Sequence, residues 1–330
     1  RAIIKSIARL TYQETENIIL KKDKKNKLFP IIYNLFNAYK ILQENSKKRN
    51  KISFNPDEYV IQTDKKENIN LIKKKKLESY KIIEEFMVLA NTIVGHYLKI
   101  NNIKSVFRNH EKPSSEKTKI LKEIISVYKL NHTGTFNSQK DFNKIISIFK
   151  ENEISYLNDI LLRSQSRALY GTENKGHFGL SLDYYVHFTS PIRRYSDLVV
   201  HRDLIDYYFL KKKNSRIEFT DHLNIQEKKA DFIERTIFDV ASSYHLKKFK
   251  NYEFKGFIDS VESFGIFIKA INFPFSGLAR FKSFNCNSQY EKKNEENYKL
   301  GQVVKFKIKK INNHNGKILL FKVKKLVDDN

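Results

Sequence analysis

The pattern of apolar residues changes from a helical to an alternating period near Tyr252, and this change most constrains the fold. Residues 303–309 (VVKFKIK) place apolar side chains on one face of a strand and lysines on the other. Shorter strand patterns precede it at residues 254–258 and 265–269, and another follows the Asn315–Gly316 turn at residues 317–323. Several short strands within about 75 residues predict a small barrel, and an OB-type barrel is the natural RNA-binding candidate. We place the domain boundary near Asn251.

Upstream of this boundary the periodicity is mainly helical, which predicts an α+β fold for the whole chain. Pro30 is suited to the first turn of a helix, and residues 78–99 form a second clear helix. Residues 51–61 (KISFNPDEYVI) read as a strand broken by the Asn55–Pro56 turn signal. Apolar residues recur at helical spacing in the first helix, at Ile31, Leu35, Ala38 and Leu42, and they form one stripe in the second, with Ile82, Phe86, Leu89 and Ile93. A different face of the second helix carries Glu84, Val88, Asn91 and Gly95, which are polar, small or short.

The chain is strongly basic, with 62 Lys and Arg against 37 Asp and Glu and a formal net charge of +25. Such a surplus predicts an acidic partner, and nucleic acid is the commonest one. The alternative is a bias toward Lys, Asn and Ile that leaves much of the lysine as solvated surface. Cys286 is the only cysteine, so neither an internal disulfide nor a Cys-rich zinc site is possible, and a reducing cytoplasm is expected. The sequence contains no run of about 18 uncharged apolar residues, so no membrane span is predicted.

Residues 176–204 (GHFGLSLDYYVHFTSPIRRYSDLVVHRDL) form the most informative segment. Ser190 and Pro191 have the residue types of an N-cap and a first helical position, which would place Arg193 and Arg194 in the first turn. Unpaired N–H groups and the helix dipole already favour an anion there, and two guanidinium groups strengthen this preference. The segment therefore predicts a phosphate site. The alternative is a surface ion pair between Arg193 and Asp197 at i,i+4.

His187 and His201 in this segment are better explained by packing or hydrogen bonding than by metal binding, because no partner cluster accompanies them.

The run HFTSPIRRYSDLVVHRDL resembles the signature of the RNB catalytic domain shared by the ribonuclease II and ribonuclease R family. Further blocks resemble the family in order and spacing, and so does the S1-type OB barrel that follows RNB domains. The resemblance implies that residues 1–249 are the C-terminal part of an RNB domain and that residues 250–330 are an S1-type barrel. It also implies processive 3′→5′ hydrolysis of single-stranded RNA to 5′-mononucleotides. The blocks are IARLTYQE, IIEEFMVLAN, FRNHEKP, LLRSQSRALY and IERTIFDV in the RNB part, and GFIDSVESFGIFIKA, SGLARF and LGQVVKFKI in the barrel.

The resemblance assigns roles to residues of the RNB part. Arg193 matches the arginine that contacts the scissile phosphate, and Arg194 matches a position that is basic in relatives. Glu84 matches a carboxylate that holds the terminal nucleotides through ribose hydroxyls; the alternative is a surface helix carboxylate, a role that suits Glu85 better. Phe54 matches an aromatic that stacks on bases, with a buried strand position as the equal alternative. Glu234 matches a position lining the same cleft.

In the barrel, Phe264 and Phe267 flank the Gly265 turn, where such barrels commonly stack bases. Barrel core is about as good an explanation for Phe267, because side chains fill the interior of small barrels. Lys305, Lys307 and Lys309 are placed to follow an RNA backbone.

Metal-assisted hydrolysis in the family uses Mg²⁺ held by an aspartate-rich segment that matches nothing in this chain. The adjacent pairs Asp57–Glu58, Glu84–Glu85 and Asp328–Asp329 diverge on a strand or helix, so we predict no metal ligands here. Three hypotheses follow: a piece of a working, monomeric exoribonuclease whose other half lies upstream or on a separate chain, a catalytically inactive RNA-binding remnant, or a structural partner of a degradation complex.

Overall fold

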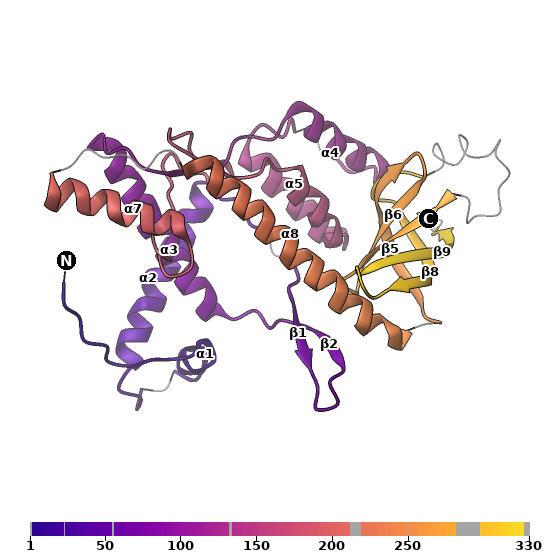
Figure 1. The fold of residues 1–330 in the computed structure, drawn as a ribbon, viewed down its shortest axis with the longest axis horizontal. Coiled ribbons are helices and arrows are strands. Elements are labelled where there is room, and N and C mark those ends of the chain that lie inside the picture. Colours follow the sequence, from indigo (N-terminus) through magenta and orange to yellow (C-terminus); the bar gives the residue numbers. More distant parts are fainter. Residues whose placement is uncertain are drawn as a thin grey trace. The chain divides into compact units, whose positions relative to one another are not determined.

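The computed structural model describes residues 2–22, 24–54, 56–131, 134–211, 219–249, 251–281 and 298–326. These form two compact units, each assembled from several segments of the chain (Figure 1). The first unit contains Arg1–Ile52, Lys75–Glu111 and Arg167–Asn224, and the second contains Ser53–Lys74, Lys112–Ser166 and Ile225–Asn330. No helix among the described residues is both long and apolar enough to cross a membrane.

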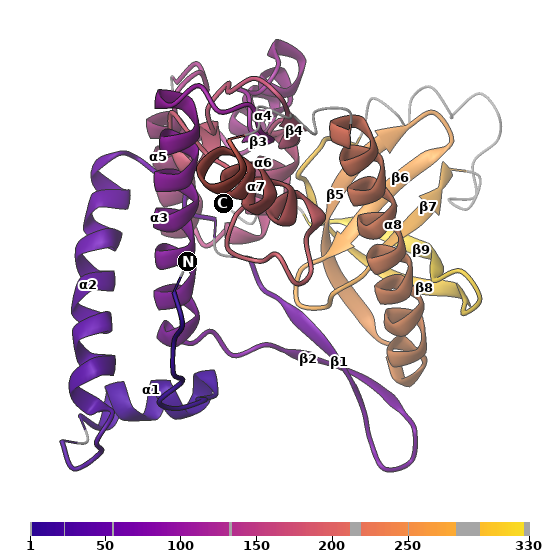
Figure 2. The ribbon, with the colours of Figure 1, turned by 60° about the vertical axis from the view of Figure 1, so that its left-hand side comes forward.

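The first unit is built on three helices, α1 (Tyr12–Lys21), α2 (Phe29–Lys48) and α3 (Glu78–Ile100). Figure 2 shows α2 alongside α3, with α1 across one end of the pair. Thr11 and Glu14 form a capping box that begins α1, and Pro30 lies in the first turn of α2 as predicted. The shared apolar core consists of Ile18, Ile19, Ile32, Tyr39 and Ile82.

The apolar residues that predicted helix α2 do not form its buried face, since Ile31 and Leu35 are exposed whereas Ile32 and Tyr39 are buried. Packing against α1 and α3 buries a face of α2 that is rotated by one residue. The helical period alone could not distinguish these two faces, because both carry apolar residues.

Helix α3 confirms the predicted helix but buries a different face. Ile82 is buried, yet Leu89 and Ile93 are exposed, and the buried positions include Glu85, Val88, Asn91 and Gly95. A Cβ atom at Gly95 would lie 3.2 Å from the backbone nitrogen of Tyr185, so glycine permits a close approach of that segment. The face of α3 that was predicted to be polar and small therefore packs against the segment around Tyr185.

The rest of the first unit consists of a short strand ladder, a short helix and helix α7 with its continuation. A short antiparallel ladder joins β3 (Phe107–Asn109) to β4 (Leu169–Gly171), and it is followed by the short helix η2 (Phe178–Leu180). Helix α7 (Tyr195–Ile205) continues into the π-helix η3 (Asp206–Leu210). A second apolar core of this unit consists of Leu98, Ile103, Phe107, Val186 and Val200.

The second unit combines helices, a hairpin and the barrel. The predicted strand at residues 51–61 is present only from Tyr59, in the hairpin of β1 (Tyr59–Thr63) and β2 (Ile69–Lys73), and Asn55 lies outside the described residues. The helical elements of the unit are α4 (Ser115–Val127), α5 (Gln139–Glu151), η1 (Ser155–Leu157), α6 (Asn158–Ser164), α8 (Thr220–His245, entering from the first unit) and η5 (Leu246–Phe249).

The C-terminal strands close into a five-stranded barrel in the order β5-β6-β7-β9-β8. The strands are β5 (Glu253–Glu262), β6 (Gly265–Ala270), β7 (Ser276–Arg280), β8 (Val303–Asn312) and β9 (Lys317–Lys325). Val304, Phe306 and Ile308 are buried between exposed or half-exposed lysines, which confirms the predicted alternation. A Cβ atom at Gly256 would lie 2.5 Å from the carbonyl oxygen of Lys269, so only glycine fits this crossing of β5 and β6.

Candidate nucleic-acid interface

Asn91 of helix α3 fixes the segment that carries the two arginines. Its side chain is 2% exposed, and its Oδ1 accepts hydrogen bonds from the backbone nitrogens of Phe188 (3.0 Å) and Thr189 (3.2 Å). Its Nδ2 donates to the Tyr185 hydroxyl at 3.2 Å. A buried amide that satisfies two backbone donors holds a loop in one conformation. Helix α3 therefore orders Phe188 and Thr189, the two residues that precede Ser190.

The two arginines lie in a turn rather than in a first helical turn. The carbonyl oxygen of Ser190 accepts from the backbone nitrogens of Arg193 (3.2 Å) and Arg194 (3.0 Å), and α7 begins only at Tyr195. The predicted N-cap at Ser190 is therefore wrong. The physical reason is Asp197, whose Oδ1 accepts from the Ser190 backbone nitrogen at 2.7 Å and so ties the turn back onto the helix.

Asp197 separates the roles of the two arginines. Its carboxylate is fully buried and accepts from Arg194 Nη2 at 2.9 Å, while Arg194 Nε lies 2.8 Å from its Oδ2. The pairing expected between Arg193 and Asp197 is thus wrong, since Arg194 takes that position at i,i+3. The Arg193 side chain is exposed and makes no hydrogen bond or ion pair within the part of the chain that the structure describes. Arg194 is held by the protein, and Arg193 is available to a ligand.

A buried polar network lies next to this turn. The Tyr170 hydroxyl lies 2.8 Å from His187 Nδ1 and accepts from Ser196 Oγ at 3.2 Å. The Arg108 guanidinium covers the Tyr170 ring at 4.5 Å, because the two residues are direct partners in the β3–β4 ladder.

Burial, reinforced by Arg194 and Arg108, lowers the pKa of His187 to about 2. His187 is therefore neutral at physiological pH and adds no further positive charge beside these arginines.

The remaining histidines of the segment support packing roles. His201 Nε2 lies 3.0 Å from the Phe188 carbonyl oxygen, and its ring stacks on that phenylalanine at 4.1 Å between centroids. Burial, followed in size by His110 and Arg108, lowers the pKa of His177 to about 3.

Glu84 lies on the same unit as the arginines and remains accessible. Its side chain is 54% exposed and accepts from Lys51 Nζ at 2.9 Å. Glu85 is buried, where it accepts from Lys51 Nζ and from Ser46 Oγ, each at 2.8 Å. The expectation that Glu85 is the surface carboxylate is wrong. Lys51, which sequence reasoning did not single out, sets the position of both carboxylates.

Phe54 and Glu234 belong to the second unit, so their predicted roles beside the arginines stay predictions. Phe54 is half-buried and lies outside any strand, next to Ser53, whose backbone nitrogen donates to Asn143 Oδ1 at 3.3 Å. Glu234 is exposed on α8.

On the barrel, Phe264 is 53% exposed, and its ring meets that of Phe267 edge-on at 6.3 Å. Phe267 lies between the inward Ile266 and Ile268 and is not part of the barrel interior, so the core explanation for it fails. The two rings form a partly open aromatic pair. Lys305 is exposed and Lys307 is half-exposed on β8.

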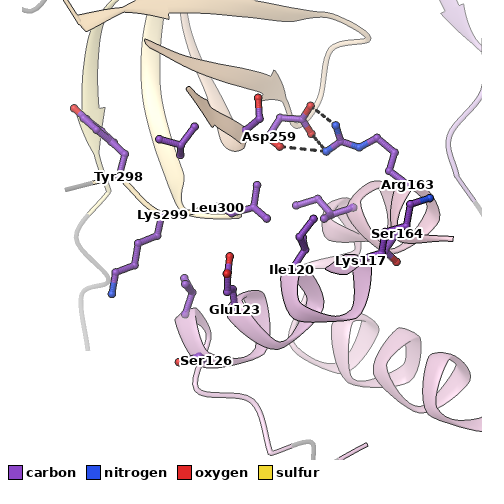
Figure 3. A pocket seen from close by; sticks show the side chains of 14 residues that line it. Lys117, Ile120, Glu123, Ser126, Arg163, Ser164, Asp259, Tyr298, Lys299 and Leu300 are labelled. Atoms are coloured by element: carbon purple, nitrogen blue, oxygen red, sulfur yellow. Dashed lines mark hydrogen bonds and ion pairs between the residues drawn. The ribbon is translucent and has the colours of Figure 1, made fainter. Parts of the chain in front are cut away.

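A pocket of about 780 Å³ lies within the second unit, between helices α4 and α6 and the barrel (Figure 3). Arg163 of α6 binds the Asp259 carboxylate of β5 through both terminal nitrogens, and the Nη1–Oδ2 contact measures 2.8 Å. This pair joins a helix to the barrel wall on one side of the pocket. Lys117 and Lys299 also line it.

The described residues contain no group of three or more His, Cys, Asp or Glu side chains able to hold a metal ion. The Asp328–Asp329 pair and Cys286 lie outside the described residues. The implied Mg²⁺ therefore has no fitting ligand set in the described part of the chain.

Comparison with known proteins identifies the family. The RNB domain matches residues 1–209, and the chain belongs to the RNB domain family. It is 29% identical to ribonuclease R of Escherichia coli over 96% of this chain and 43% of that protein. It is 33% identical to ribonuclease R of Aquifex aeolicus over 86% of this chain and 42% of that protein. The chain thus spans less than half the length of these relatives.

The fold is also similar to that of a solved structure, Mycoplasma genitalium RNase R in complex with ribose-methylated single-stranded RNA. The TM-score is 0.83 at 24% sequence identity, and the match covers 94% of this chain and 52% of that one.

Proposed function

We propose that this chain is the RNA-gripping part of a ribonuclease R-like exoribonuclease, which hydrolyses single-stranded RNA processively from its 3′ end to 5′-mononucleotides. The observation that carries the proposal is the ordered turn that presents Arg193 while Asp197 holds Arg194. An unpaired guanidinium on a rigid turn is suited to stabilising charge on a phosphoryl group. Membership of the RNB domain family supports this assignment.

The other site residues receive roles in this proposal. Glu84 accepts hydrogen bonds from ribose hydroxyls, since its carboxylate is accessible and is positioned by Lys51. Phe54 stacks on a base near the 3′ end, and Glu234 lines the same path. Phe264 and Phe267 stack on bases from the barrel, which we assign as an S1-type OB fold. In the complete enzyme, Mg²⁺ held by ligands outside the described residues would activate a water molecule and neutralise phosphate charge.

A second candidate is an RNA-binding protein without catalysis. It is favoured by the lack of a group of metal-ligating side chains among the residues that the structure describes. Both candidates share the RNA-gripping surface and differ only in whether bound RNA is cut.

The experiment that tests the proposal is a gel of 5′-labelled single-stranded RNA incubated with the chain, with Mg²⁺ and with EDTA. We expect retention of RNA without shortening, with affinity reduced by Arg193→Ala. A shortening ladder abolished by EDTA would assign hydrolysis to this chain alone and would disprove the expectation that its metal ligands lie elsewhere. Salt-sensitive binding that Arg193→Ala leaves unchanged would remove the phosphate-gripping role of the turn.

A further inference from the structure

Three lysines form a row across the outer surface of the barrel. Lys255 of β5 is the direct partner of Lys305 of β8, and Lys305 is in turn the direct partner of Lys324 of β9. All three are exposed. Neighbouring strands lie about 4.8 Å apart, so three ammonium groups share a span of roughly 10 Å. Like charges placed directly opposite each other destabilise a sheet. This row contains two such pairs.

No described acidic residue neutralises the row. The side chains of Lys255, Lys305 and Lys324 make no hydrogen bond or ion pair with any described residue. The nearest opposed acid in the ladder is Glu253, which is the partner of Lys307 rather than of a row member. An unfavourable arrangement of this kind is relieved when an anion binds across it.

The positive surface continues along β8 into a basic hollow. Lys309 and Lys310 lie where the β8–β9 register shifts, and together with Lys247 they line a hollow of about 560 Å³. A second register shift, after Lys305, is accompanied by Lys322 in the left-handed region with φ 53°. Bulges of this kind turn side chains away from the regular alternation. From Lys305 to Lys310 the strand extends about 17 Å, so the row and the hollow form one lysine track.

The track is separate from the aromatic pair. In the barrel order, β6 and β8 lie on opposite sides of β5. Phe267 of β6 is paired with Ser260 near one end of β5, whereas Lys255 lies near the other end. Five residues of strand correspond to about 17 Å, so one side chain cannot serve both surfaces.

We propose that the lysine track binds the phosphate backbone of an RNA strand as a second contact, apart from the aromatic pair. Lysine is a mobile point charge that binds phosphate without fixing a sequence. A lipid surface fits less well, because the described residues of β5, β8 and β9 expose no large apolar side chain to insert. The identity of the polyanion rests on the proposed function, whereas the anion-binding character rests on the track itself.

The test compares two triple variants of equal charge. Lys255→Gln, Lys305→Gln and Lys324→Gln remove the row, while Lys119→Gln, Lys122→Gln and Lys144→Gln remove exposed lysines from α4 and α5. Binding of labelled 20-nucleotide poly(U) and poly(A) is measured by fluorescence anisotropy over a range of KCl concentrations. Each single-strand phosphate contact contributes about 0.7 to the salt slope, so the row variant should lower it by about 2. Affinity at low salt should fall about tenfold for both RNAs, and the control variant should change neither quantity.

Thermal unfolding is the control for folding defects. The row variant removes repulsion between exposed lysines, so it should unfold at no lower temperature than the parent chain. A further triple variant, Lys247→Gln, Lys309→Gln and Lys310→Gln, should lower the slope by a similar amount if the hollow belongs to the track.

Equal salt slopes for the row and control variants would overturn the track while leaving the proposed function standing. A reduced slope in a chain that fails to hydrolyse RNA with any metal or upstream partner would support the track and remove the nuclease assignment. Binding to phosphatidylserine vesicles with no binding to RNA would overturn both.

Discussion

The division of labour between Arg193 and Arg194 gives the sharpest prediction. Arg194→Gln removes two contacts to a carboxylate that is fully buried, at 2.9 Å and 2.8 Å. Among the described residues, Asp197 then keeps only the Ser190 backbone nitrogen and Ser196 Oγ as donors. A hydrogen bond to a charged group contributes about 1.5–3 kcal/mol. The Arg194 side chain is 24% exposed and glutamine replaces part of the hydrogen bonding, so we expect a loss of about 2–4 kcal/mol.

Arg193→Gln is the matched control, because it removes the same charge from the next residue. Its side chain is exposed, so the free energy of unfolding should change by no more than about 0.5 kcal/mol. RNA affinity should instead fall about 10- to 100-fold, the equivalent of one lost charged hydrogen bond. Urea unfolding followed by circular dichroism measures the first quantity, and fluorescence anisotropy with labelled RNA measures the second.

The reasoning is refuted if the two variants lose equal stability, since the buried ion pair would then not distinguish them. It is also refuted if Arg194→Gln weakens RNA binding at unchanged stability while Arg193→Gln does not. That outcome would exchange the roles assigned to the two arginines.

Three other predictions concern stability. Burial lowers the pKa values of His187 to about 2 and His177 to about 3, so only the unfolded chain takes up these protons below about pH 6.5. Stability should be full above that pH and should fall as the pH is lowered from about 6.5 toward 3, by up to about 1.4 kcal/mol per pH unit for each histidine. His187→Gln should reduce this slope, which urea unfolding measures. Arg163→Met leaves the Asp259 carboxylate, 16% exposed, without its arginine and should lower stability by about 1–3 kcal/mol. Asp259→Asn should lower stability less than Arg163→Met, because burial already raises the pKa of Asp259 and disfavours its charged form. Thermal unfolding of both variants measures the difference. Gly256→Ala places a Cβ atom 2.5 Å from the Lys269 carbonyl oxygen and should lower the thermal midpoint by the equivalent of about 1–3 kcal/mol, and an unchanged midpoint would contradict the close crossing.

The barrel was the most predictable part of the fold. Alternation of apolar residues and lysines in residues 303–309 depends only on the period of a strand, and β8 follows it. Helix α3 was equally predictable in extent but not in orientation. Its buried face is decided by Asn91 and Gly95, which receive the segment around Tyr185, and no local pattern reveals a partner so distant in sequence.

The candidate site was predictable in its residue types but not in its geometry. The pair of arginines was visible in the sequence, but Ser190 and Pro191 wrongly predicted a helix start. Asp197 binds the Ser190 backbone nitrogen, and the helix begins only at Tyr195. Arg108 and Tyr170 were missed, although both lie in blocks that resemble the family. They meet because a three-residue ladder pairs β3 with β4, and pairing between such short strands carries almost no sequence signal.

Arg193 and the lysine track, two of the proposed RNA contacts, differ in rigidity, and this difference should separate their effects in solution. Arg193 extends from a turn fixed by Asp197, so its charge is placed before RNA arrives and little ordering is needed on binding. The lysine track carries its charges on flexible stems of exposed strands, which adjust to any backbone but contribute mainly through counterion release. Loss of Arg193 should therefore lower affinity at every salt concentration while changing the salt slope by about one contact. Loss of the row should change the slope most and have little effect at high salt, where counterion release no longer favours binding.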